Sequence, residues 1–125
     1  MRINKNNRCT CDCNSIHEEK MNMATLELKK IKIIDKMVKF YKNFSDETRL
    51  KILVVLDKVG QMCVCDIAVS LNMTKSAISH QLRYLKECNL VRSIKLGKEV
   101  FYDLSDEHVK DIIELAIEHL GEDEK

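Results

Sequence analysis

Apolar residues recur at a helical spacing over the first half of the chain. Between Thr25 and Phe44 they lie mostly three or four positions apart with lysines between them, which predicts one amphipathic helix. Ser45-Asp46 interrupts this pattern and supplies an N-cap. A second helix is predicted from Glu47 to Lys58, and Gly60 closes it.

Two shorter helical segments follow. The first is predicted from Val64 or Cys65 to Leu71, and Asn72 marks a tight turn after it. Thr74 caps the next helix, which runs to about Glu87. Two short helices joined by a brief turn predict a helix–turn–helix.

The periodicity then changes from helical to β-like. Two β-leaning runs, Leu90–Leu96 and Glu99–Leu104, flank Gly97-Lys98 and predict a hairpin. A last helix is predicted to begin at Ser105 or Asp106. Its isoleucine-rich surface is apolar over more than one stripe, which suggests a dimer interface. The whole pattern predicts a mainly α, dimeric winged helix–turn–helix with a small β-hairpin.

Composition separates the amino terminus from the rest. Residues 1–20 are polar and rich in Asn and Cys, so we expect a flexible arm there and one DNA-binding and dimerisation domain over residues 21–125.

No apolar run approaches the roughly 20 residues that cross a bilayer, and the amino terminus lacks a secretory pattern. We therefore expect a cytoplasmic protein with no membrane partner. Because the cytoplasm is reducing, the six cysteines favour thiol or metal chemistry over disulfides. One of them, Cys88, is predicted to pack in the core.

Charge is unevenly distributed although the net charge is only +1. Residues 72–98 hold six basic residues against one acidic residue, and residues 99–125 hold ten acidic residues against two lysines. A basic segment on a near-neutral protein indicates contact with a polyanion. In a helix–turn–helix the second helix enters the major groove, and the hairpin tip can touch phosphate or the minor groove. The predicted DNA-binding residues are Lys75, Ser76, Ser79, His80, Gln81, Arg83, Lys95 and Lys98.

Cysteines are concentrated at two places that the fold could bring together. Cys63 and Cys65 lie where the third predicted helix begins, so both sulfurs can converge and the helix N-terminus favours thiolate. Cysteines also alternate along the predicted arm, where no core exists to bury them. An arm closing over the first pair gives a three- or four-sulfur site suited to cadmium, lead or zinc. The arm cysteines are Cys9, Cys11 and Cys13.

A second candidate metal site uses nitrogen and oxygen ligands at the two ends of the last helix. His108 and His119 are eleven residues apart, so they face almost the same way but lie about 16 Å apart along the axis. Two such helices packed antiparallel in a dimer bring Asp106 and His108 of one subunit to His119 and Glu122 of the other. Four such ligands suit Zn(II).

These residues resemble a known family of regulators. The segment Met62–Ile67, the helix Ser76–Leu82, and Asp106-Glu107-His108 with His119 are similar to the ArsR/SmtB family of metal-responsive repressors, closest to its CadC-like cadmium, lead and zinc sensors. The resemblance covers roughly residues 37–122. It implies a homodimer that binds operator DNA when metal-free and releases it on binding metal.

The resemblance also implies the ligands of both metal sites. Cys63 and Cys65 with two arm cysteines form the sensing site in the CadC-like branch. Cys9 and Cys13 fit the arm spacing of the family, and Cys11 is an additional thiol. The carboxylate–histidine set, Asp106, His108, His119 and Glu122, matches the second, interhelical zinc site of the family.

Other functions remain open from the sequence. An arsenite sensor with three thiolates, or a sensor of thiol oxidation, would keep the same fold and DNA-binding surface. A small thiol enzyme or metal-trafficking protein is a third alternative. Against it, the chain has no Cys-x-x-Cys motif and no nucleophile–base set, so we predict that it is not an enzyme.

Overall fold

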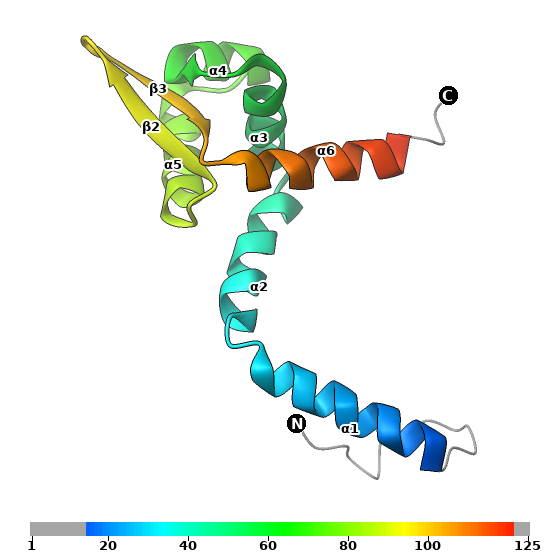
Figure 1. Cartoon of the computed structure of the whole chain (residues 1–125). Helices are drawn as coiled ribbons and strands as arrows, with labels where there is room; N and C mark the ends of the chain where they lie inside the picture. Colours follow the sequence, from blue (N-terminus) through cyan, green and yellow to red (C-terminus); the bar gives the residue numbers. More distant parts are fainter. Residues whose placement is uncertain (1–14, 122–125) are drawn as a thin grey trace. The chain divides into compact units, whose positions relative to one another are not determined.

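Figure 1 shows the computed structural model of the chain, which describes residues 15–121. The chain divides into two units, Met1–Met37 and Val38–Lys125. The three cysteines of the predicted arm and Glu122 lie outside the described residues.

The single helix expected over Thr25–Phe44 is wrong. The structure has two helices, α1 (Ser15–Lys30) and α2 (Ile34–Lys42), followed by a short 3-10 helix, η2 (Asn43–Ser45). The sequence between the two α-helices is Ile-Lys-Ile, directly after two lysines. The β-branched isoleucines and the lysines three and four positions apart, Lys29, Lys32 and Lys36, lower helix stability there, and the amphipathic pattern conceals this. The expected end of the arm at residue 20 also falls inside α1.

The helix–turn–helix is confirmed. Helix α3 (Glu47–Val59) precedes it, and the motif itself consists of α4 (Val64–Leu71) and α5 (Lys75–Glu87). Asn72 adopts the left-handed conformation, with φ of 56°, and so ends α4 sharply. The hydroxyl of Thr74 accepts a hydrogen bond from the backbone N–H of Ala77 at 3.1 Å and caps α5.

The hairpin is also confirmed, with an additional strand. Strands β2 (Val91–Leu96) and β3 (Glu99–Leu104) form the wing, whose tip projects away from the helices (Figure 1). A two-residue strand, β1 (Met62–Cys63), pairs antiparallel with the other side of β3. The sequence pattern missed β1 because two residues carry no detectable alternation.

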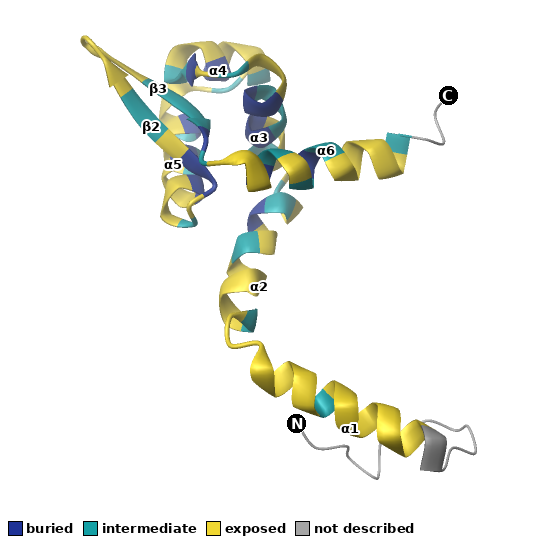
Figure 2. Ribbon diagram, in the orientation of Figure 1, coloured by how far each residue is buried: buried dark blue, intermediate teal, exposed yellow. Residues whose placement is uncertain are grey.

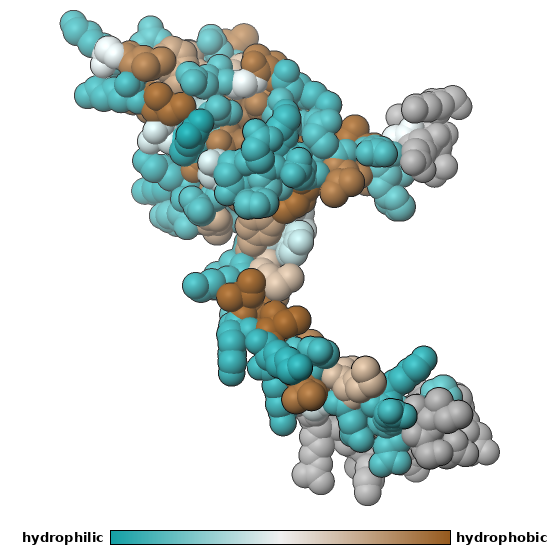
Figure 3. Space-filling model, in the orientation of Figure 1, coloured by the Kyte–Doolittle hydropathy of each residue, from teal (hydrophilic) through white to brown (hydrophobic). Residues whose placement is uncertain are grey.

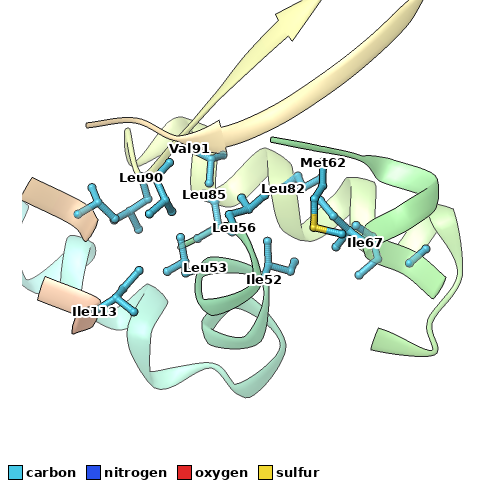
Figure 4. Close-up of a cluster of buried hydrophobic side chains, with 14 residues drawn as sticks. Ile52, Leu53, Leu56, Met62, Ile67, Leu82, Leu85, Leu90, Val91 and Ile113 are labelled. Carbon is cyan, nitrogen blue, oxygen red and sulfur yellow. The ribbon is translucent and has the colours of Figure 1, made fainter. Parts of the chain in front are cut away.

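The core lies between α3, α4, α5 and the base of the wing (Figure 4). The most deeply buried side chains come from each of these elements, and Met62 of β1 also reaches the core. Cys88, predicted as a core residue, is half-buried and packs against this cluster. The fully buried side chains are Ile52, Leu53, Leu56, Ile67, Ile78, Leu82, Leu85, Leu90 and Val91.

The last helix, α6 (Glu107–Gly121), begins where it was predicted. Asp106 caps it, because its Oδ1 accepts a hydrogen bond from the N–H of Val109 at 3.2 Å. Val109 and Ile113 pack into the core, whereas most of the helix surface is exposed (Figure 2). Within residues 15–121, no helix is both long and apolar enough to span a membrane.

Candidate nucleic-acid and metal-binding sites

One face of α5 carries most of the predicted DNA-binding side chains. Because Ile78, Leu82 and Leu85 are buried on the opposite face, the polar positions between them point away from the core. Five predicted residues on this helix are exposed: Lys75, Ser76, Ser79, His80 and Arg83. Arg83 Nη2 lies 3.3 Å from His80 Nδ1, so these two side chains form one polar pair.

Gln81 differs from the other predicted α5 residues. It is half-buried, and its Oε1 accepts a hydrogen bond from Nη1 of Arg49 on α3 at 2.9 Å. The guanidinium carbon of Arg49 also lies 5.2 Å from the ring centroid of Tyr84, within the range of a cation–π contact. Arg49 was not predicted as a functional residue, because a contact across 32 positions leaves no local signal in the sequence.

The two wing lysines occupy the exposed end of the hairpin. Lys95 lies on β2, and Lys98 follows Gly97, whose φ of 64° forms the turn. Nearer its base, the wing is attached to α5, because Lys86 Nζ donates a hydrogen bond to Ser93 Oγ at 2.8 Å. This bond joins the carboxyl-terminal part of α5 to the inner half of β2.

The two cysteines of the third predicted helix lie at its start, as expected. Cys63 ends β1 and occupies the N-cap position of α4, and Cys65 lies in the first turn. Cys63 is half-buried and Cys65 is exposed, and both thiols are free. They line a hollow of about 660 Å³, called here the thiol hollow. Its other lining residues are Val64, Asp66, Lys75, Ser79, Glu99 and Val100.

The thiol hollow does not by itself form a metal site. Within residues 15–121, no group of three or more His, Cys, Asp or Glu side chains is placed to hold a metal ion. Two accessible thiols suit a soft metal, but such an ion takes three or four ligands. A metal ion bound by Cys63 and Cys65 would therefore need further ligands from outside the described residues or from another molecule.

The carboxylate–histidine residues are placed at opposite ends of α6. At its start, His108 Nδ1 lies 3.6 Å from Asp106 Oδ1, and the side chain of His108 is 91% exposed. His119 is exposed near the other end of the helix, and Glu122 lies outside the described residues. Within the described residues, the chain brings Asp106 and His108 together and places His119 near the other end of the helix.

An ion pair that sequence analysis missed joins α6 to α3. Lys110 Nζ donates to Asp57 Oδ1 at 2.7 Å, and the side chain of Asp57 is fully buried. Burial alone would raise the pKa of Asp57, but the hydrogen bond from Lys110 and the positive charges of Lys110 and Lys58 hold this pKa below its ordinary 3.8. The hydrogen bond to Asp57 raises the pKa of Lys110. The sequence signal for this ion pair was Asp57 itself, a charged residue on the apolar face of α3.

A buried three-helix core, a helix–turn–helix with an exposed basic face and a β-hairpin wing define a winged helix–turn–helix DNA-binding regulator. Residues 46–93 match the sequence profile of the bacterial regulatory protein, arsR family. The chain is 42% identical over 112 residues to a cadmium resistance transcriptional regulatory protein CadC homolog from Staphylococcus aureus, covering 90% of this chain and 92% of that one. It belongs to the ArsR/SmtB family of bacterial transcriptional regulators, which confirms the resemblance seen in the sequence.

Two further comparisons support this assignment. A transcriptional repressor SmtB homolog from Synechocystis is 32% identical over 112 residues, covering 90% of this chain and 84% of that one. The homodimeric winged helix–turn–helix DNA-binding domain Mb0332 from Mycobacterium bovis matches in structure with a TM-score of 0.66 and 29% identity, covering 74% of this chain and 88% of that one. The protein is thus a transcriptional repressor of this family and not an enzyme.

Proposed function

We propose that this protein is a metal-sensing repressor that binds operator DNA as a homodimer when metal-free and dissociates when Cd(II), Pb(II) or Zn(II) binds. Its release in the cytoplasm would switch on genes of metal resistance or efflux. The proposal is supported by the similarity to a regulator of cadmium resistance. It is also supported by the two accessible thiols in the thiol hollow.

In this proposal α5 enters the major groove and the wing contacts the DNA backbone. The exposed hydroxyls and cations of α5 suit base edges and phosphates, and Lys95 and Lys98 suit phosphate or the minor groove. A repressor dimer would present two such surfaces to two half-sites.

The proposed sensing site contains Cys63 and Cys65, completed by Cys9 and Cys13 of the arm. Cys11 is the alternative arm ligand, because all three arm thiols lie within five residues. Thiolate sulfur prefers soft cations, which favours cadmium and lead, and four thiolates also suit zinc.

The observation that carries the proposal is the composition of the thiol hollow. Cys63 and Cys65 share it with Lys75 and Ser79, which are two of the predicted DNA-binding residues of α5. An arm and a metal ion held there would lie against the amino-terminal half of α5, which is also the half that meets base edges. Metal and DNA would then compete for one region, and each would weaken the binding of the other by the same factor.

A second physical connection runs through the sheet. Cys63 pairs with Phe101 of β3, and Val100 of the same strand lines the thiol hollow. A metal ion that fixes Cys63 therefore also restrains the inner strand of the wing. The basic tip and the basic helix would both respond to occupation of one site.

The proposed dimer uses the exposed apolar side chains of α6. Leu115, Ile117 and Leu120 are 63%, 39% and 72% exposed, and brown hydrophobic atoms are visible on this helix in Figure 3. A second copy of α6 would cover them, as the homodimeric relative suggests. Antiparallel pairing of two α6 helices would also form the interhelical site from Asp106, His108, His119 and Glu122, which we propose to be a regulatory or vestigial Zn(II) site.

A cadmium titration of the reduced protein tests the proposal. The duplex would first be selected from a random pool with metal-free protein, then labelled and bound before cadmium is added. Thiolate-to-cadmium charge-transfer absorption reports binding, and fluorescence anisotropy reports the DNA. We expect absorption to saturate at one metal per subunit with three or four sulfurs while the DNA dissociates in step.

Other outcomes would identify the alternatives. Release by zinc without thiolate absorption would make the interhelical site the sensor. If arsenite or an oxidant releases the DNA and cadmium does not, the protein is still a repressor, but its signal is arsenite or thiol oxidation. Absence of selected DNA binding in the metal-free protein would contradict the proposal itself.

A further inference from the structure

The contact between Arg49 and Gln81 determines what chemistry Gln81 can offer to DNA. Nη1 of Arg49 donates to Oε1 of Gln81 at 2.9 Å. The same guanidinium lies over the ring of Tyr84, one turn further along α5, at 5.2 Å. Two contacts from one rigid, planar group hold Arg49 against α5.

The chemistry of the two side chains fixes the orientation of the Gln81 amide. A carboxamide has an acceptor oxygen and a donor NH₂ group that exchange places when the amide rotates. An arginine side chain has five N–H donors and no acceptor. Only the oxygen of Gln81 can therefore face Arg49, and the NH₂ group is the end left for another partner.

This orientation disfavours one mode of base recognition. Glutamine recognises adenine through both ends of its amide, accepting from N6 and donating to N7. With its oxygen already accepting from Arg49, the Gln81 amide has one lone pair left at that end and two N–H donors at the other, so donation is the favoured contact with DNA. Its remaining donor suits a DNA acceptor, which is guanine O6 or N7, thymine O4 or a phosphate oxygen.

We propose that Arg49 is a positioning residue that orients the Gln81 amide, so that Gln81 acts at the DNA interface only as a hydrogen-bond donor. This rests on the proposed function, in which α5 contacts operator DNA. Tyr84 extends the same arrangement, because its ring and that of His80 form a T-shaped pair with 5.0 Å between centroids, and His80 pairs with Arg83 at 3.3 Å. Arg49 thus contacts Gln81 and Tyr84 directly, and His80 and Arg83 lie next to Tyr84 in this chain of contacts.

Gln81→Glu is the first test, because glutamate keeps an acceptor for Arg49 but has no donor. We expect its thermal stability to stay at or above the wild-type value and its affinity for the selected duplex to fall by about tenfold, because the variant loses the donor that contacts the DNA. Gln81→Met is the control that removes both ends of the amide. Unchanged affinity of Gln81→Glu would overturn the proposal.

Arg49→Met is the second test, because it frees the amide to rotate. Affinities are measured against two panels of duplexes, one with each base pair replaced and one with each phosphate replaced by a neutral methylphosphonate. Many positions should matter in the wild type, and among them we expect one position in each half-site, in one panel only, to lose its effect in both Gln81→Met and Arg49→Met. A base position identifies a base acceptor, and a phosphate position identifies a backbone oxygen.

Three results would oppose the proposal. A Gln81-dependent preference for adenine would show that both ends of the amide contact the DNA. A Gln81-dependent position that Arg49→Met leaves unchanged would show that Arg49 does not orient the amide. A uniform loss of affinity in Arg49→Met, with no position affected, would reduce its role to general support of the fold. Failure of the wild type to select any duplex would instead contradict the proposed function.

Discussion

Lys110 on α6 donates a hydrogen bond to the buried carboxylate of Asp57 on α3, with 2.7 Å between Nζ and Oδ1. The ammonium also lies 3.3 Å from the backbone oxygen of Asp57. Lys58, next to Asp57, reaches the same segment of α6 through Glu114 at 3.0 Å. The proposed dimerisation helix is therefore joined by charge to α3, which forms part of the DNA-binding core.

Asp57→Asn should destabilise the protein at neutral pH by about 1.5–3 kcal/mol, because it weakens a hydrogen bond to a charged group. Urea unfolding at one fixed protein concentration measures this, since the stability of a dimer depends on concentration. Glu47→Gln is a matched control, because Glu47 forms only an exposed pair with Lys51 on the same helix. An equal loss in both variants would contradict a special role for the buried pair.

The stability that Asp57 contributes should depend on pH in one direction. Its pKa in the folded protein lies below the ordinary 3.8, so protonation favours the unfolded chain. The contribution is fully present above about pH 4 and is lost as pH falls through the lower folded pKa. The difference in unfolding free energy between wild type and Asp57→Asn should therefore shrink as the pH falls below about 4. A difference that grows on acidification would show the opposite sign of the pKa shift.

Local patterns were sufficient for most of the DNA-binding unit. The helix–turn–helix has a cap at each boundary, Thr74 before α5 and Asn72 after α4, and both residues have side chains or backbone angles typical of those positions. The buried positions of α5 follow a single stripe, so its exposed face was predictable as well. The predicted start of α4 likewise placed Cys63 and Cys65 at that end of the helix.

The sequence could not provide the contacts between distant positions. Strand β1 exists because Met62 and Cys63 lie beside Tyr102 and Phe101, about 40 positions away. The Arg49–Gln81 bond and the Asp57–Lys110 pair are likewise tertiary, with no periodic signal. The break between α1 and α2 was missed for a different reason, because an amphipathic stripe continues across a segment whose β-branched residues disfavour helix.

Cys63→Ser should separate DNA binding from metal sensing. Removing one thiolate should weaken cadmium binding by at least about 100-fold, since even outer-shell partners contribute about 10–100-fold. Operator affinity without metal should stay unchanged, because Cys63 is only half-buried and serine is nearly isosteric. Cys88→Ser is the matched control, because Cys88 is also half-buried but packs against the core and is not a proposed ligand. It should leave release by cadmium unchanged. Normal release by cadmium in Cys63→Ser would rule out this thiol as a ligand.

His119→Ala should leave release by cadmium intact while weakening zinc binding at the interhelical site. His119 is exposed on α6, so the substitution should change unfolding free energy by less than about 0.5 kcal/mol. Competition of zinc against a chromophoric chelator counts the sites per dimer, and His17→Ala on α1 is the control for an exposed histidine. Loss of cadmium release in His119→Ala, with His17→Ala normal, would place the sensor between the α6 helices.

Lys98→Gln should weaken DNA binding by nearly the same factor for every duplex. Lys98 lies in the exposed turn of the wing, and an exposed ammonium that neutralises phosphate carries no sequence information. Each neutralised phosphate contact contributes about 0.9 to the slope of log affinity against log salt, so the variant should lower the magnitude of that slope by about this amount per subunit. Lys51→Gln, which removes an exposed lysine on α3 paired with Glu47, should leave the slope unchanged. A change confined to one sequence, or an unchanged slope in Lys98→Gln, would mean that the wing does not bind the DNA backbone through this residue.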